Sequence, residues 1–153
     1  MASLTTNKNF LSPVGFRLTL DSTKYPNLEY FCTGVSLPDV TIGEAAVPYR
    51  GATVNYTGDR VEFSDFTMTF PVTEDMDNYK ETFAWIQDMT SSDEVELCDA
   101  MLSIFTSKNN VGNRIKFKDC FPISLSGVEF TTNGEFEFLQ ASATFKYTTF
   151  DFV

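Results

Sequence analysis

Apolar and polar residues alternate along the segment from Val61 to Val72, with the period of two that is typical of a β-strand. The apolar positions are odd at Val61 and Phe63 and even from Phe66 onward, so we expect a bulge or bend at Ser64-Asp65. Alternation recurs in three other runs, at residues 16–20, 115–118 and 135–152, and the last of these changes phase twice. The pattern predicts a mainly β protein, an antiparallel β-sandwich or partial barrel.

One segment has a helical pattern instead. Met76, Tyr79, Phe83 and Ile86 follow a spacing of three and four residues, which predicts one flanking α-helix at about residues 75–89. Thr73 or Asp75 is the expected N-cap. The remaining expected elements are a second strand at 28–35 that pairs with 16–20, short strands at 101–105 and 123–125, and a hairpin turn at 132–134. Residues 90–113 otherwise give no clear pattern.

Residues 40–58 predict a long projecting hairpin, because two short alternating runs flank Arg50-Gly51. Pro48 cannot donate a ladder hydrogen bond, so this arm is an edge or pairs outside the main sheet. Two interpretations stay open: a mobile surface loop, or an arm that docks on a neighbouring subunit and covers an apolar edge. In the second, the residues that contact the neighbour are Ile42, Val47, Tyr49, Arg50, Val54 and Tyr56.

The length and charge of the chain limit its function. Its 153 residues suit a single domain at residues 14–153, preceded by a polar and flexible arm at residues 1–13. Its formal net charge of −10 disfavours binding to nucleic acids or to an anionic membrane surface, and no run is long enough for a membrane span. With no histidine and only three cysteines, in no Cys-x-x-Cys motif, the chain has no Ser-His-Asp triad and no zinc site.

No catalytic, metal or cofactor site is expected. Acidic clusters at residues 59–65 and 93–96 are better explained as solvated surface than as a glycosidase pair, and residues 75–79 lack the glycine and late glutamate of a calcium loop. We expect Gly58, Asp59 and Arg60 to form a structural turn before the following strand. The basic residues Arg114, Lys116 and Lys118 are expected to form ion pairs with the acidic surface of a neighbouring subunit.

An ordered series of motifs resembles the tail tube proteins of contractile-tailed bacteriophages. It begins with Phe16-Arg17-Leu18-Thr19-Leu20 and a run from Tyr30 to Leu37-Pro38, and continues with Gly58-Asp59-Arg60 and Phe63-Ser64-Asp65-Phe66-Thr67-Met68-Thr69-Phe70. The helix with Trp85, Phe121-Pro122 and the closing Phe145-Lys146-Tyr147-Thr148-Thr149-Phe150 complete the series, which covers residues 14–152. The Gly-Asp-Arg strand is the more specific motif, and the others carry weight through their order.

The resemblance implies a non-enzymatic virion protein of the tail, assembled in the host cytoplasm. Six copies join their sheets into a ring, and the rings stack into a conduit through which DNA passes without specific binding. The partners implied are further copies, the tail sheath and the baseplate, with no cofactor and no membrane. An acidic lumen would let DNA slide. The alternatives are a tube-like baseplate initiator or tail terminator, a monomeric β-sandwich that binds a ligand, and a carboxylate hydrolase.

Overall fold

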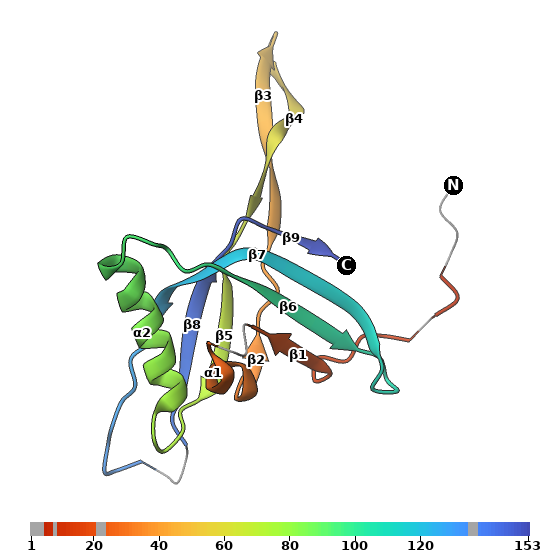
Figure 1. The fold of residues 1–153 in the computed structure, drawn as a ribbon. Helices are drawn as coiled ribbons and strands as arrows, with labels where there is room; N and C mark the ends of the chain where they lie inside the picture. The colour runs from red at the N-terminus through yellow and green to blue at the C-terminus, as the bar shows by residue number, and fades with distance from the viewer. Residues whose placement is uncertain (1–4, 8, 21–23, 135–137) are drawn as a thin grey trace.

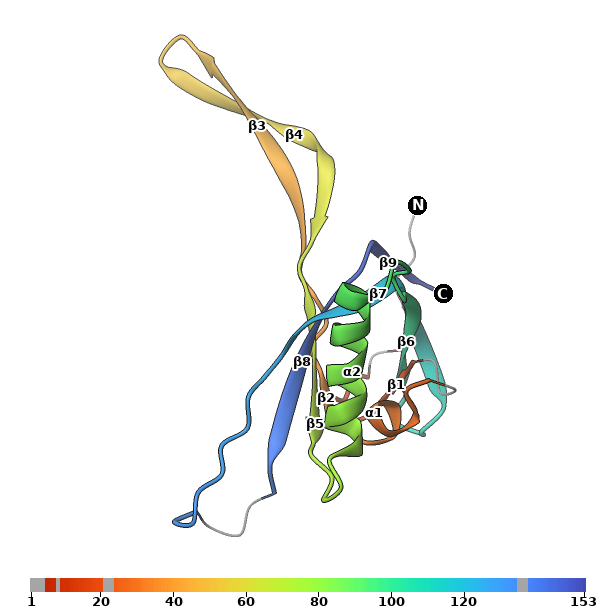
Figure 2. The same ribbon diagram turned by 60° about the vertical axis from the view of Figure 1, so that its left-hand side comes forward.

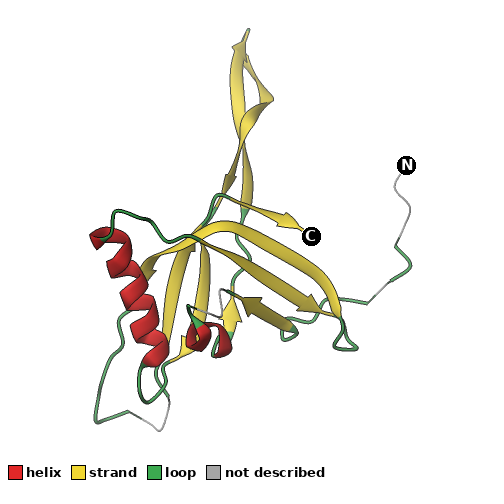
Figure 3. Cartoon of the chain, in the orientation of Figure 1, coloured by secondary structure: helices red, strands yellow, loops and turns green. Residues whose placement is uncertain are grey.

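The computed structural model describes residues 5–7, 9–20, 24–134 and 138–153, and it is built mainly of antiparallel strands (Figures 1 and 3). The elements in chain order are β1 (Phe16–Thr19), α1 (Pro26–Tyr30), β2 (Gly34–Val35), β3 (Val40–Tyr49), β4 (Ala52–Phe63), β5 (Phe66–Pro71), α2 (Asp77–Ser91), β6 (Cys98–Phe105), β7 (Val111–Leu125), β8 (Gln140–Lys146) and β9 (Thr149–Phe152). Parts of the predicted arm (1–4 and 8) and of the predicted last strand (135–137) lie outside the described residues.

The main sheet has seven strands in the order β1-β6-β7-β8-β5-β2, with β9 also paired to β7. The long strand β7 organises it: its residues 115–118 pair with β9, and its residues 121–125 pair with β8. The strand β6 lies along the other edge of β7. The sheet bends at the middle of β7, between the segments that pair with β9 and with β8, where Asp119 has a φ of 56°. The result is the antiparallel, partly rolled architecture that the alternation predicts.

The helix α2 covers one face of the sheet over β5 and β8 (Figure 2). Phe66, Met68 and Phe70 of β5 are fully buried there, as the alternation predicts. Phe66 stacks on Phe145 of β8, with ring centroids 5.1 Å apart. Trp85 of α2 lies 5.7 Å from the ring of Phe145 and donates its Nε1–H to the carbonyl of Glu96 at 3.0 Å, so this aromatic contact joins helix and sheet.

The opposite face of β5 and β8 carries hydroxyl side chains. Thr67 is opposite Thr144 in the register, and Thr69 is opposite Ser142. Because side chains alternate between the two faces of a strand, these four residues point away from the face that α2 covers. They are partly exposed and none of them is charged.

The predicted hairpin between residues 16–20 and 28–35 is wrong. Residues 26–30 form the short helix α1, and β1 pairs with β6 instead. Pro26 suits the start of a helix, and Glu81 of α2 accepts hydrogen bonds from the Leu28 backbone N–H at 3.1 Å and from Asn27 Nδ2 at 2.7 Å. These long-range contacts hold a helix that is too short to be stable alone.

The remaining element boundaries agree with the sequence pattern in part. The predicted break at Ser64-Asp65 is confirmed, since β4 ends at Phe63 and β5 begins at Phe66. Residues 115–118 and 123–125 are one strand rather than two, and the short strand expected at 101–105 extends back to Cys98. The helix begins at Asp77 after Met76, whose φ is 56°, while the predicted cap Thr73 accepts the Asp77 N–H through Oγ1 at 3.2 Å.

Candidate assembly interface

The hairpin of β3 and β4 projects from the body of the molecule (Figures 1 and 2). Within the described part of the chain, each of these two strands pairs only with the other. All ten residues of β3 are exposed, and at roughly 3.3 Å per residue the strand is about 33 Å long. An isolated two-stranded hairpin is marginally stable in water, so this ribbon is a surface that needs a covering partner.

One face of the outer hairpin is entirely apolar. The register pairs Ala45 with Tyr56, Val47 with Val54, and Tyr49 with Ala52. Strand alternation places these six side chains together, and we call them the apolar face. The other face of the same segment is more polar, with Thr53 and Asn55 among its members. Tyr49 is 67% exposed and Tyr56 is 60% exposed, although such side chains normally bury most of their surface.

The predicted contact residues therefore divide into three groups. Val47, Tyr49, Val54 and Tyr56 share the apolar face, whereas alternation along β3 places Ile42 on the opposite face of the ribbon. Ile42 is paired with Val61 near the root of the hairpin. Arg50 lies at the tip. The sequence analysis missed Ala45 and Ala52, whose membership of the apolar face appears only once the register is known.

The predicted structural turn at Gly58, Asp59 and Arg60 is wrong, because all three residues lie inside β4. They form a β-bulge, at which the register jumps from Ile42–Val61 to Glu44–Thr57. A Cβ on Gly58 would lie 2.5 Å from the carbonyl oxygen of Gly43, so the two backbones cross too closely for any side chain there. The glycine that suggested a turn in the sequence is instead required by the close approach of the two backbones at this bulge.

The tip of the hairpin is a two-residue turn formed by Arg50 and Gly51, whose φ angles are 34° and 82°. Two positive φ values are typical of the type I′ turn that suits the twist of a hairpin. Asparagine, aspartate or glycine is the usual first residue of such a turn. An arginine there costs about 1–2 kcal/mol in left-handed backbone conformation.

Two of the three basic residues of β7, Lys116 and Lys118, have partners within the chain, which corrects for them the expected pairing with a neighbour. Lys116 Nζ lies 3.1 Å from the Asp99 carboxylate, and Lys118 Nζ lies 3.4 Å from that of Asp151. The Asp119 backbone N–H and the Lys116 ammonium lower the pKa of Asp99 below 3.8. Both pairs are largely exposed and tie β7 to β6 and β9.

The described residues hold no group of three or more cysteine or acidic side chains that could bind a metal ion. Burial raises the pKa of Cys120 to about 12 and that of Cys32 to about 11, so both thiols are poor nucleophiles at neutral pH. No helix in the described ranges is long and apolar enough to cross a membrane.

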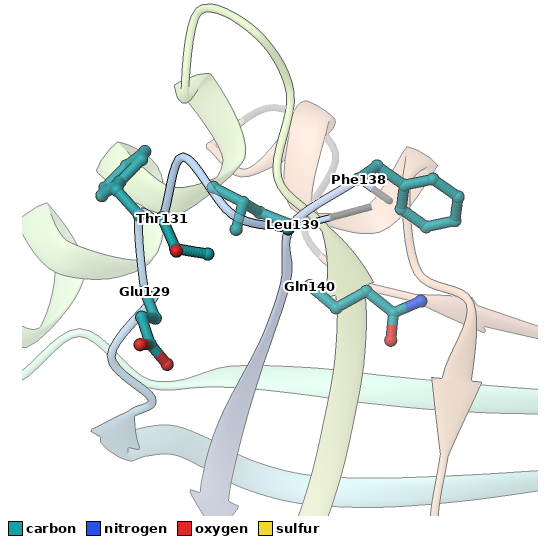
Figure 4. A pocket seen from close by; sticks show the side chains of 7 residues that line it. Glu129, Thr131, Phe138, Leu139 and Gln140 are labelled. Atoms are coloured by element: carbon teal, nitrogen blue, oxygen red, sulfur yellow. The ribbon is translucent and has the colours of Figure 1, made fainter. Parts of the chain in front are cut away.

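A pocket of about 760 Å³ lies at the end of the molecule away from the hairpin, in the loop between β7 and β8 (Figure 4). Among the described residues that line the pocket, Glu129 is the only ionisable one. The other lining residues are Phe130, Thr131, Gly134, Phe138, Leu139 and Gln140.

We compared the sequence and the fold of the chain with known proteins. A family model described as "Phage tail tube protein" matches residues 3–119. No curated protein sequence matches significantly. A structure described as an extracellular contractile injection system, PVC sheath-tube complex in the extended state, has a TM-score of 0.75 at 16% identity and covers 99% of both chains.

Two further structures are similar in fold. The anti-feeding prophage tube terminating cap has a TM-score of 0.76 at 16% identity, over 99% of this chain and 95% of that chain. Hcp1 from Flavobacterium johnsoniae has a TM-score of 0.56 at 14% identity, over 90% and 94%.

Proposed function

Because the chain belongs to the phage tail tube protein family, we propose that six copies form a ring and that the rings stack into the inner tube of a contractile tail. The family consists of structural tube proteins, so the chain is a structural component of a tube and not an enzyme. The observation that carries the proposal is the exposed apolar face of the β3–β4 hairpin, which no described part of the same chain covers.

Open sheet edges support ring formation. Within the described residues, β1 pairs with β6 alone and β2 pairs with β5 alone, which leaves an unpaired edge on each side of the sheet. Open edges promote association, and joining them between copies around a ring removes them. The two structures with similar folds are described as a sheath-tube complex and a tube terminating cap.

The hairpin supplies the contact between rings in this proposal. Its length of about 33 Å carries the apolar face well beyond the body of its own subunit. Val47, Tyr49, Val54 and Tyr56 then pack on the adjacent ring, Arg50 reaches the same surface from the tip, and Ile42 packs at the root. In the same proposal, residues 1–13 also contact the neighbouring ring.

The hydroxyl face of β5 and β8 is the proposed wall of the lumen. Thr67, Thr69, Ser142 and Thr144 are uncharged, and alternation along β8 adds one cation, Lys146, at the end of the same face, so a passing DNA would find few cationic groups to bind. In this arrangement α2 lies outside, toward the sheath. The proposed wall is therefore mainly hydroxyl, whereas the composition predicted an acidic lumen.

Light scattering over a range of concentrations, followed by cryo-electron microscopy, tests the proposal. We expect six-membered rings that stack as the concentration rises, with α2 on the outer surface. A monomer at every concentration would favour a ligand-binding β-sandwich and refute the assembly. Rings with α2 facing the lumen would refute the assignment of the hydroxyl face to the lumen, while the proposal of ring assembly would stand.

A tube terminator or baseplate initiator is the second candidate, since the fold is equally similar to a terminating cap and also to a baseplate component with a TM-score of 0.67 at 10% identity. The number of copies in each assembled particle separates the two. Many dozens indicate the repeated tube subunit, and about six indicate a terminator or an initiator.

A further inference from the structure

The hairpin joins the body of the molecule through two short segments. Residues 36–39 lead from β2 into β3, and residues 64–65 lead from β4 into β5. At this root the Asp39 backbone N–H donates to Ser64 Oγ at 2.7 Å, and the Ser64 backbone N–H donates to the Asp39 carbonyl at 3.0 Å. These bonds hold the two legs of the hairpin to each other, so a tilt on the body moves the hairpin as one unit. Its direction therefore depends on contacts between the root and the body.

A small tilt at the root is a large displacement at the tip. A rotation of about 10° displaces the end of a strand about 33 Å long by up to about 6 Å, which exceeds the roughly 4.8 Å between neighbouring strands of a sheet. The apolar face, with Tyr49 and Tyr56, would then miss the surface on which it is proposed to pack. Holding a binding element in its bound direction beforehand reduces the conformational freedom that association removes. A contact that fixes the root therefore favours assembly.

Tyr147, in the turn between β8 and β9, lies beside the root of the hairpin (Figure 1). Its hydroxyl donates to the Ser64 carbonyl at 2.8 Å, across 83 positions of the chain. Its ring centroid lies 6.1 Å from that of Phe63, the last residue of β4. Phe150 of β9 adds a second ring contact with Phe63, at 5.3 Å. The C-terminal segment thus supports the root through one hydrogen bond and two aromatic contacts.

The ring of Tyr147 is itself held by the core. Its centroid lies 5.1 Å from that of Phe117 and 5.7 Å from that of Phe66, and both of these phenylalanines are fully buried. Aromatic pairs at such separations attract each other in several relative orientations. A hydrogen bond is more directional, since it weakens steeply as its angle departs from linear. The Tyr147 hydroxyl is therefore the group of this cluster that can fix an angle.

We propose that Tyr147 is a positioning residue, which sets the direction of the hairpin for contact with the adjacent ring through the hydrogen bond from its hydroxyl to the Ser64 carbonyl. This inference rests on the proposed stacking of rings. It assigns a role in stacking to a residue that lies outside the apolar face and is anchored in the body of the subunit.

The substitution Tyr147→Phe tests the role, because it removes the hydroxyl and keeps the ring. The matched control is Tyr79→Phe near the start of α2, since the Tyr79 hydroxyl also donates to a backbone carbonyl, that of Ser126 at 3.2 Å. Pulsed electron paramagnetic resonance then measures the distance between spin labels at the exposed positions 53, on the hairpin, and 87, on α2. The labels are carried by non-natural amino acids, which spares the three native cysteines, and the protein is kept below the critical concentration for assembly.

We expect Tyr147→Phe to broaden the distance distribution by several ångströms and Tyr79→Phe to leave it unchanged. In sedimentation assays Tyr147→Phe should raise the critical concentration for tube formation roughly three- to tenfold, the factor that corresponds to one hydrogen bond, and Tyr79→Phe should not change it. Denaturant titration should show a similar small loss of stability in both variants, so a purely structural role would not separate them.

Two results would overturn the positioning role: an unchanged distance distribution in Tyr147→Phe, or a broadened distribution with normal assembly. The distance measurement is made on the single subunit and does not depend on tubes. A broadened distribution in a protein that never forms tubes would therefore refute the proposed stacking, while the control of the hairpin direction by Tyr147 would stand.

Discussion

Replacing Tyr49 and Tyr56 together by aspartate should abolish tube formation and leave the subunit folded. The two rings have exposed fractions of 67% and 60%, so burial by a neighbour would remove roughly 250 Å² of surface, taking about 200 Å² for each side chain. At about 25 cal/mol per Å² this is worth up to ~6 kcal/mol for each hairpin. Even half of that raises the critical concentration more than about a hundredfold.

The assay is sedimentation of assembled tubes over a concentration series, with negative-stain microscopy of the pellet. The matched control is Thr53→Asp with Asn55→Asp, which adds the same number of charges to the same hairpin on the opposite face of the ribbon. The core should not sense either pair, so both variants should unfold within about 0.5 kcal/mol of the original protein. Tubes that form normally from the tyrosine variant, or fail equally in both variants, would refute the role of the apolar face.

Three further predictions concern the fold. Trp85→Ala should lower the free energy of unfolding by about 3–5 kcal/mol in denaturant titrations, since the fully buried indole leaves a large cavity, and a loss below about 1 kcal/mol would contradict its central position. Gly58→Ala should block tube formation without moving the core unfolding transition, because the added Cβ meets the Gly43 backbone; normal tubes would contradict this. Asp99→Asn should destabilise the protein at neutral pH. The Asp119 backbone N–H and the Lys116 ammonium lower the pKa of Asp99, so the ionised carboxylate stabilises the fold above pH 3.8, and this stabilisation is lost as the pH falls through the folded-state pKa. A stability deficit that is independent of pH in unfolding curves would contradict the assignment.

Local patterns predicted the elements whose stability is largely local. The strand β5 and the bend before it follow from alternation alone. Apolar spacing predicted the position of α2 but not its buried face, which consists of Asn78, Thr82 and Trp85, whereas Phe83 is 51% exposed. The short helix α1 was missed because it depends on Glu81, more than fifty residues along the chain. No pattern near Leu28 contains that information, so tertiary contacts decided the outcome.

The candidate site was predictable in composition but not in geometry. Alternation and Pro48 identified the hairpin, and its aromatic residues were expected to be contacts. The placement of Ile42 and Tyr49 on opposite faces of the ribbon depends on the strand register. The close approach of Gly43 and Gly58 depends on a β-bulge between residues that are distant in sequence. The exposure of Phe130 gave no periodic signal, since the surrounding loop has no regular structure.

Because the ribbon leaves one end of the molecule and the loop occupies the other, a stack of identical copies has a direction. In the proposed tube, the hairpin ribbons would be uncovered at one terminus, and the opposite surface of the subunit would be uncovered at the other. A protein that seeds growth therefore needs to imitate only one of these surfaces, and a protein that halts growth needs to imitate only the other. In such a tube, one fold would be enough to begin, extend and close the filament, because each role uses a different surface.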